Sequence, residues 1–233
     1  IKYFSVVLSE EGRCGQTRTI AMPPHVHRDP RPEVGRGRMS RETATGIWTH
    51  VWETRGPLRD KRSPFGARSP GTTAYSWYSE TWSYPFGGNT YPAAPTPDAL
   101  WELYIEACGG VGATPVARGR LGVLVNVYGP IPADSKARGR HKLGAHRDDE
   151  PMNDADHDVV MVVLGASAGA TRDLWIQDLA PGSGRTVVTL RHGDMLRADL
   201  VSAVHSVQWR KHNAGQCWGT VTFRALRPLP GGI

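Results

Sequence analysis

The stretch on which the fold assignment turns is Leu143-Gly144-Ala145-His146-Arg147-Asp148. In an extended segment, residues two apart point to the same face, so His146 and Asp148 could bind one ion while Arg147 points away. A second histidine, His205, lies fifty-seven positions beyond Asp148. Two imidazoles and one carboxylate form the ligand set that leaves open coordination positions in non-haem Fe(II) sites. A His-x-Asp tripeptide is common by chance, so the surrounding sequence must decide whether it binds metal.

The region from Leu121 onward consists of short apolar runs separated by turns. The runs that we interpret as strands are Leu121–Tyr128, Leu143–Asp148, Val159–Leu164, Arg172–Gln177, Thr186–Leu190, Asp194–Ala198, Val204–Gln208 and Gly219–Ala225. Pro181-Gly182-Ser183-Gly184 and His192-Gly193-Asp194 are turn signals between them. Eight short strands with few helices predict a mainly β protein whose core is a double-stranded β-helix, or jelly roll. The metal ligands would then meet at one mouth of the barrel.

The region before Leu121 has a different composition. Residues 22–70 are rich in proline, glycine and arginine, which favours loops with short strands, one of them at Ile47–Trp52. Asp98–Ala107 has apolar residues at helical spacing and an early acid, and Gly109-Gly110 follows to end the helix. We therefore expect one continuous domain: residues 1–96 form a basic, aromatic-rich extension and substrate lid, and residues 97–233 form the core with one or two buttressing helices.

The charge of the chain is positive and unevenly distributed. Lys and Arg number 28 against 22 Asp and Glu, and the stretch from Arg13 to Arg68 holds twelve basic residues against five acidic ones. This surplus indicates a polyanionic partner, and nucleic acid is favoured over membrane because no amphipathic basic helix is visible. The alternative is that the arginines only solvate irregular loops.

The cysteines and hydropathy indicate a compartment. Cys14, Cys108 and Cys217 form no C-x-x-C pair, which favours a reducing environment over a disulfide framework or a zinc finger. No apolar run reaches the roughly 18 residues of a spanning helix. We expect an intracellular monomer, nuclear or cytoplasmic. Because the chain begins at Ile1 instead of methionine, we interpret it as a trimmed fragment, with a removed targeting segment left open.

Several further motifs stand in a fixed order around the opening stretch. They are Asn126-Val127-Tyr128, Asp149-Glu150, Leu164-Gly165, Ala170-Thr171-Arg172-Asp173, His192-Gly193-Asp194, His205-Ser206 and Thr222-Phe223-Arg224. In this order they resemble the AlkB family of Fe(II)- and 2-oxoglutarate-dependent dioxygenases, and most closely its nucleic-acid dealkylating branch. The resemblance covers about 105 residues, Leu121 to Ala225, and the N-terminal half matches only loosely.

The resemblance implies the cofactors and the residues that hold them. The implied Fe(II) ligands are His146, Asp148 and His205. Asn126 and Tyr128 would hydrogen-bond 2-oxoglutarate, and Arg224 would pair with one of its carboxylates through a planar guanidinium. The implied reaction converts 2-oxoglutarate and dioxygen to succinate and carbon dioxide, hydroxylates an N-methyl carbon, and releases formaldehyde from the base.

The substrate residues are less sharply defined. Glu150 stands where relatives place an acidic residue near the target base. Trp77, Tyr78 and Trp82 are candidates for contact with a flipped base in alkylated DNA or RNA, because such chemistry needs the base out of its stack with an aromatic ring against it. The competing interpretation is that these aromatic residues pack a small core.

One position departs from the family pattern. The family has two arginines six residues apart on the last strand, but six residues before Arg224 this chain has Trp218. An indole cannot neutralise a carboxylate, and burying an unpaired carboxylate costs several kcal/mol. Three outcomes are open: a neighbouring cation such as Lys142 or Arg210 substitutes, the co-substrate is not 2-oxoglutarate, or the enzyme is weak or inactive.

The other polar residues near the motifs have structural interpretations. His192 is a turn residue instead of a ligand, Asp194 caps that turn, and His141 and His157 are solvated loop histidines. Arg172-Asp173 braces neighbouring strands, with a role near the site left open. The sequence thus predicts an oxidative dealkylase of nucleic-acid bases. The alternatives are a 2-oxoglutarate oxygenase acting on a protein or small molecule, and a nucleic-acid binding module whose catalytic site has decayed.

Overall fold

The computed structural model describes residues 33–55, 59–62, 68–86, 89–130, 143–165, 171–177, 184–209 and 215–228. The helices are α1 (Arg41–Thr54), α2 (Asp98–Val111) and the short 3-10 helix η1 (Arg118–Arg120). The larger sheet comprises β1 (Gly35–Arg38), β2 (Arg59–Arg62), β3 (Arg68–Ser79), β6 (Leu121–Tyr128), β8 (Val159–Gly165), β11 (Asp194–Ala198) and β13 (Trp218–Ala225). The smaller sheet comprises β7 (Leu143–His146), β9 (Thr171–Gln177), β10 (Arg185–Arg191) and β12 (His205–Trp209), and β4 (Tyr84–Phe86) pairs with β5 (Asn89–Tyr91).

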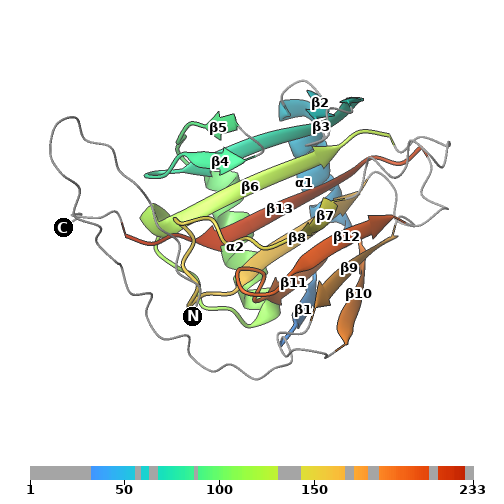
Figure 1. Ribbon diagram of the computed structural model, residues 1–233. Coiled ribbons are helices and arrows are strands. Elements are labelled where there is room, and N and C mark those ends of the chain that lie inside the picture. Colours follow the sequence, from blue (N-terminus) through green and yellow to red (C-terminus); the bar gives the residue numbers. More distant parts are fainter. Residues whose placement is uncertain are drawn as a thin grey trace, which may run out of the picture.

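The architecture is two antiparallel sheets that face each other, with the helices behind the larger one (Figure 1). The strand order is β1-β11-β8-β13-β6-β3-β2 in the larger sheet and β10-β9-β12-β7 in the smaller. This arrangement confirms the predicted mainly β jelly roll. Each of the eight predicted strands is present, with ends within two residues of the prediction. Among the described residues, no helix is both long and apolar enough to span a membrane.

The central strands are buried on both faces, and the two faces carry different residues. On β6, Val123, Val125 and Val127 pack into the core that the helices cover. The alternate residues Asn126 and Tyr128 point into the space between the sheets and line a pocket there. The same alternation on β13 sends every second side chain toward this pocket, because strand side chains have a period of two.

The predicted strand at Ile47–Trp52 is wrong, because this segment lies within α1. Ser40 caps the helix by accepting a hydrogen bond from the Thr43 backbone N–H at 3.0 Å. The buried residues Ala44, Trp48 and Val51 recur at helical spacing, so packing against the sheet outweighs the β propensity of the aromatic and branched residues.

Trp48 of α1 fits against the sheet because residue 219 has no side chain. A Cβ at Gly219 would lie 2.7 Å from the Trp48 ring. The glycine in β13 therefore lets the helix approach the sheet closely, and any larger residue would push the indole away.

The predicted helix at Asp98–Ala107 is confirmed as α2, which buttresses the larger sheet (Figure 1). It does not end at Gly109-Gly110 but continues to Val111. Gly112 ends it with a left-handed backbone, φ 67°, where its N–H donates to the Cys108 carbonyl. The described part of residues 1–96 also belongs to the core, since β1 and β3 pair with β11 and β6.

The turn residues behave as predicted. His192 is buried, and its Nδ1 accepts a hydrogen bond from the Gly165 backbone N–H at 3.1 Å. Asp194 caps the same turn, since its carboxylate accepts from the Arg191 N–H at 2.7 Å. Burial lowers the pKa of His192, which keeps the ring neutral and able to accept. His192 therefore holds a loop and is not a metal ligand.

Candidate metal centre and its pocket

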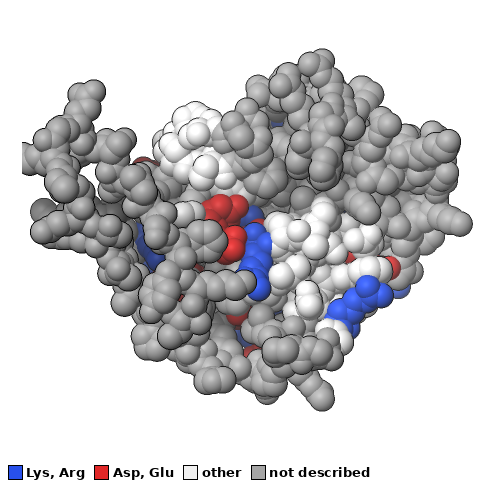
Figure 2. Space-filling model, viewed as in Figure 1, with Lys and Arg blue, Asp and Glu red and all other residues white. Residues whose placement is uncertain are grey.

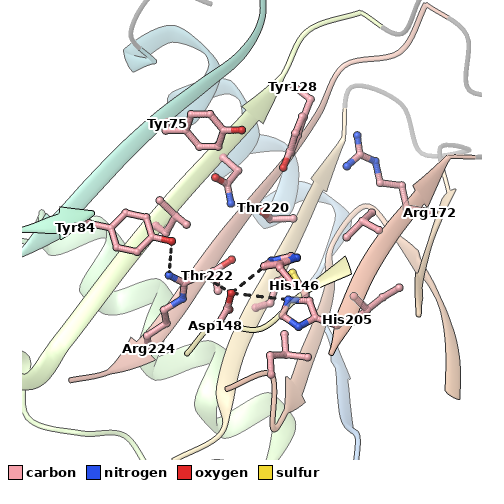
Figure 3. Close-up of a pocket in the computed structure, with 16 residues that line it drawn as sticks. Tyr75, Tyr84, Tyr128, His146, Asp148, Arg172, His205, Thr220, Thr222 and Arg224 are labelled. Atoms are coloured by element: carbon pink, nitrogen blue, oxygen red, sulfur yellow. Dashed lines mark hydrogen bonds and ion pairs between the residues drawn. The ribbon is translucent and has the colours of Figure 1, made fainter. Parts of the chain in front are cut away.

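The two predicted histidine ligands come from neighbouring strands of the smaller sheet. His146 ends β7 and His205 begins β12, and the two residues pair directly across the ladder. Asp148 follows β7, and its backbone N–H donates to the Leu200 carbonyl at 2.9 Å. One ligand atom from each of His146, Asp148 and His205 lies within 4.8 Å of the others. The structure thus brings the three together as a group that could hold a metal ion (Figure 3).

Backbone carbonyls fix which nitrogen of each histidine faces the shared point. His146 Nδ1 lies 2.8 Å from the Gly144 carbonyl oxygen, and His205 Nδ1 lies 3.2 Å from that of Ala203. Because a carbonyl can only accept, each Nδ1 carries a proton and donates it, so Nε2 is the nitrogen that can bind a metal. The Nε2 atoms lie 3.6 and 3.8 Å from Asp148 Oδ1. Such outer hydrogen bonds are how proteins orient imidazole ligands toward a metal.

His205 is also held in the protonation state that metals bind. Burial lowers its pKa to about 4, although nearby Asp148 acts in the opposite direction. At neutral pH the ring therefore carries no charge and offers its Nε2 lone pair.

Arg224 pairs directly with the carboxylate of the group. Its Nη2 lies 2.9 Å from Asp148 Oδ1, and both side chains are almost fully buried. Nη1 donates to the Tyr84 hydroxyl at 2.9 Å, and that hydroxyl donates to Glu150 at 2.7 Å. Burial alone would lower the pKa of Arg224, but Asp148, Tyr84 and Glu150 raise it above its ordinary value. The guanidinium therefore stays charged and holds the Asp148 carboxylate in place.

Glu150 belongs to a hydrogen-bond network next to Asp148. Besides Tyr84, it accepts a hydrogen bond at 2.8 Å from the Asn153 amide, which also donates to the Asp148 carbonyl at 2.8 Å. Sequence patterns gave no signal for Asn153, because its role depends on a loop conformation.

The group opens into a pocket between the two sheets (Figure 3). Its polar lining includes Asn126, Tyr128 and Arg224, the three residues predicted to bind the co-substrate. The Asn126 amide donates to Thr220 Oγ1 at 3.3 Å. Its Oδ1, like Arg224 Nε, has no hydrogen-bond partner among the described residues. Buried polar atoms of this kind need a partner, so the lining fits a small polar ligand next to a metal ion.

Five polar pocket residues were not predicted as site residues. They are Tyr75, Tyr84, Arg172, Thr220 and Thr222. The two threonines carried a usable signal, since they lie between Trp218 and Arg224 at even spacing on one strand. Tyr84 carried none, because β4 reaches the pocket only through the tertiary fold.

Trp218 is fully buried, with an exposed fraction of 1%. Lys142 and Arg210, the candidates for supplying the missing charge in one of the three open outcomes, lie outside the described residues. The described cation beside the indole is Arg172, whose guanidinium carbon lies 4.5 Å from the centre of the Trp218 ring.

The candidate base-contacting aromatics do not line the pocket. Trp77 stacks on Tyr84 with ring centroids 4.7 Å apart and donates to the Trp82 carbonyl at 2.7 Å. Tyr78 lies on the opposite face of β3 and packs against the helix-covered core. Trp82 packs beside Trp77 and donates to the Arg227 carbonyl at 3.1 Å. These contacts are those of packed residues.

Replacing Trp77 with alanine is expected to lower the free energy of unfolding by about 3–5 kcal/mol, as for other large core aromatics. The indole fills the space over Gly122, where a Cβ would lie 2.4 Å from it, and contacts Tyr84. Urea denaturation would measure the loss, and the half-buried Trp82→Ala variant is the control with a smaller expected loss. Unchanged stability with weaker binding to methylated oligonucleotide would instead show that Trp77 contacts the base.

Comparison with known proteins gives a structural likeness only. Neither a protein-family model nor a curated protein matches the sequence. The solved structure of OsALKBH1 is similar over 85% of this chain and 100% of its own, with 19% identity and a TM-score of 0.54. A putative oxygenase from Shewanella oneidensis is 13% identical, with coverage of 87% and 84% and a TM-score of 0.49. A Pseudomonas putida prolyl-4-hydroxylase is 11% identical, with coverage of 84% and 92% and a TM-score of 0.47. The likeness to OsALKBH1, together with the two facing sheets, shows that this chain has the fold of an AlkB-like 2-oxoglutarate oxygenase.

Proposed function

We propose that the chain is an Fe(II)- and 2-oxoglutarate-dependent dioxygenase that removes N-methyl groups from nucleic-acid bases. The observation that carries the proposal is the group His146, Asp148 and His205, with both Nδ1 atoms hydrogen-bonded to backbone carbonyls and a polar pocket beside it. Two imidazoles and one carboxylate are the ligand set of non-haem Fe(II) oxygenases.

The chain's own residues would position the reactants. His146, Asp148 and His205 would hold the iron, and Arg224 fixes the carboxylate of that set through its 2.9 Å ion pair with Asp148. Asn126 and Tyr128 line the same pocket and supply an amide and a hydroxyl for 2-oxoglutarate. Iron with 2-oxoglutarate and dioxygen supplies the oxidising chemistry that hydroxylates the N-methyl carbon. The apolar residues between the sheets exclude water from the reacting groups.

The nucleic-acid substrate is supported by the order of the sequence motifs and by the basic surplus between Arg13 and Arg68. Most of these arginines fall outside the residues whose side chains are described. On the face shown in Figure 2, the described basic side chains form separate small groups, one of them beside acidic side chains near the centre. In the proposed function, phosphate contacts made by the basic segment would supply affinity for the strand, and the pocket would recognise the methylated base.

The test is turnover by the Fe(II)-loaded chain with methylated single-stranded DNA and RNA oligonucleotides. We expect succinate and formaldehyde in equal amounts, only when 2-oxoglutarate is present, and binding that weakens steeply with salt. Succinate without formaldehyde from any oligonucleotide, and a flat salt response, would point to a protein or small-molecule substrate. Oligonucleotide binding without 2-oxoglutarate binding or turnover would point to a decayed site and refute the proposal.

A further inference from the structure

Arg172 is a buried charge in the pocket. It lies on β9 with an exposed fraction of 2%, on the same inward face as Leu174 and Ile176. Its even spacing from these core residues means that the strand directs the guanidinium between the sheets and not outward. Arg172 lines the pocket (Figure 3), which a purely structural contact between strands would not require.

The guanidinium rests on two aromatic rings of the facing sheet. Its central carbon lies 4.8 Å from the ring centre of Tyr128 and 4.5 Å from that of Trp218. Tyr128 and Trp218 are directly paired residues of β6 and β13, so the two rings lie side by side and both contact the guanidinium. Aromatic faces hold a guanidinium in a fixed orientation and leave its N–H edges able to donate. Trp218 and Tyr128 together therefore hold a cation that comes from the other sheet.

The position of Arg172 relative to the iron group suits an extended diacid. Ile176 pairs with His205, and Arg172 lies four residues earlier on the same face of β9, about 13 Å along the strand. Figure 3 shows Arg172 and Tyr128 at one end of the pocket and Arg224 with Tyr84 at the other. The arginine side chain spans part of the distance between residue 172 and the metal group. A short-chain dianion bound to the metal would span the rest.

The charges lining the pocket also favour a dianion. Two guanidinium groups, Arg172 and Arg224, face it against the single carboxylate of Asp148. Arg224 is committed to that carboxylate at 2.9 Å. Burial lowers the pKa of Arg172, which means that the charged form gains from an anion beside it. A metal ion would raise the positive charge further.

We propose that Arg172 binds the distal carboxylate of 2-oxoglutarate, with Tyr128 beside it, and so replaces the arginine that the family pattern places at position 218. The inference rests on the proposed function, because it assigns a residue to the co-substrate of that reaction. The planar guanidinium can donate two parallel hydrogen bonds to the carboxylate, which gives selectivity for a 2-oxo acid with a second acidic group.

The test compares two ligands that differ only at the distal end, 2-oxoglutarate and 2-oxopentanoate. Each is titrated calorimetrically into the full chain loaded with Mn(II), a redox-inactive substitute for Fe(II). For the wild type we expect 2-oxoglutarate to bind on the order of 100-fold more tightly than 2-oxopentanoate. Arg172→Gln should lose most of this factor for 2-oxoglutarate and leave 2-oxopentanoate affinity and Mn(II) content unchanged. Arg172→Lys should lose an intermediate factor, because it keeps the charge but not the planar group.

Two further variants make the result specific. Arg185 lies over the Trp175 ring at 3.7 Å on the outward face of the same sheet, so Arg185→Gln is the matched control and should change neither affinity. Adding Trp218→Arg to Arg172→Gln should restore part of the 2-oxoglutarate affinity.

The outcomes separate the inference from the proposed function. Wild-type protein that binds metal but not 2-oxoglutarate would refute the proposed function and the inference with it. Wild-type protein that binds 2-oxoglutarate no more tightly than 2-oxopentanoate, or an Arg172→Gln protein that keeps wild-type affinity, would overturn the inference alone. If Arg172→Gln loses its Mn(II), the inference is tested instead by the wild-type preference for 2-oxoglutarate over 2-oxopentanoate and by the 2-oxoglutarate affinity of Arg172→Lys.

Discussion

Replacing His146 with alanine is expected to abolish stoichiometric Fe(II) binding, with a loss of affinity of at least about 100-fold. Removing an outer-sphere partner of a ligand already costs about 10–100-fold, and this change removes a ligand itself. His146 lies at the end of β7 with a side chain 27% exposed, so the variant opens little space in the core. The loss should therefore be confined to the metal site.

The measurement is iron content after anaerobic loading and desalting, together with the thermal midpoint of the metal-free protein. His157→Ala is the matched control: this histidine is also part-exposed, but it contacts Asp154 at 3.2 Å and lies outside the pocket. We expect His157→Ala to bind one iron per chain, and His146→Ala to keep the metal-free midpoint. Full iron content in His146→Ala would show that the metal binds elsewhere or not through this group.

The sequence was most informative where residue type and strand spacing act together. His146 and Asp148 were candidates because residues two apart in an extended segment face one side, although β7 ends at His146 and Asp148 lies just beyond it. His205 was added through the order of the surrounding motifs. The eight strands of the core were predictable because apolar runs bounded by turn residues are a local signal. The strands of the core follow from such local patterns, whereas the metal group also required the order of the motifs along the chain.

The sequence was least informative where contacts between distant segments decide. Ile47–Trp52 has strand-like residues, yet it lies within the helix that Ser40 caps. Trp48 of this helix packs over Gly219, 171 positions away. The position of Arg172 could not be predicted for the same reason. Its guanidinium lies against Trp218 only because β9 and β13 belong to different sheets that face each other. Spacing along one strand cannot reveal a side chain supplied by another.

Replacing Arg224 with methionine is expected to destabilise the metal-free protein by about 3–5 kcal/mol, the usual cost of removing one partner of a buried ion pair. Methionine fills a similar volume but leaves the Asp148 carboxylate buried without its 2.9 Å partner. The same change releases the carboxylate from its fixed orientation, so metal affinity should fall by about 10–100-fold. The two effects share one cause and should appear together.

Urea denaturation and Mn(II) titration measure the two effects, and two variants locate the cause. Tyr84→Phe removes the hydroxyl that accepts from Arg224 at 2.9 Å but leaves the pair with Asp148, so it should cost only about 1 kcal/mol and keep the metal. Arg224→Lys keeps the charge and should recover more of the stability than of the metal affinity, because an ammonium cannot reproduce the planar contact. If Arg224→Met matched the wild type in both measurements, the guanidinium would not be what holds Asp148 in place, and the orientation of that ligand would have to come from the Leu200 and Asn153 hydrogen bonds to its backbone.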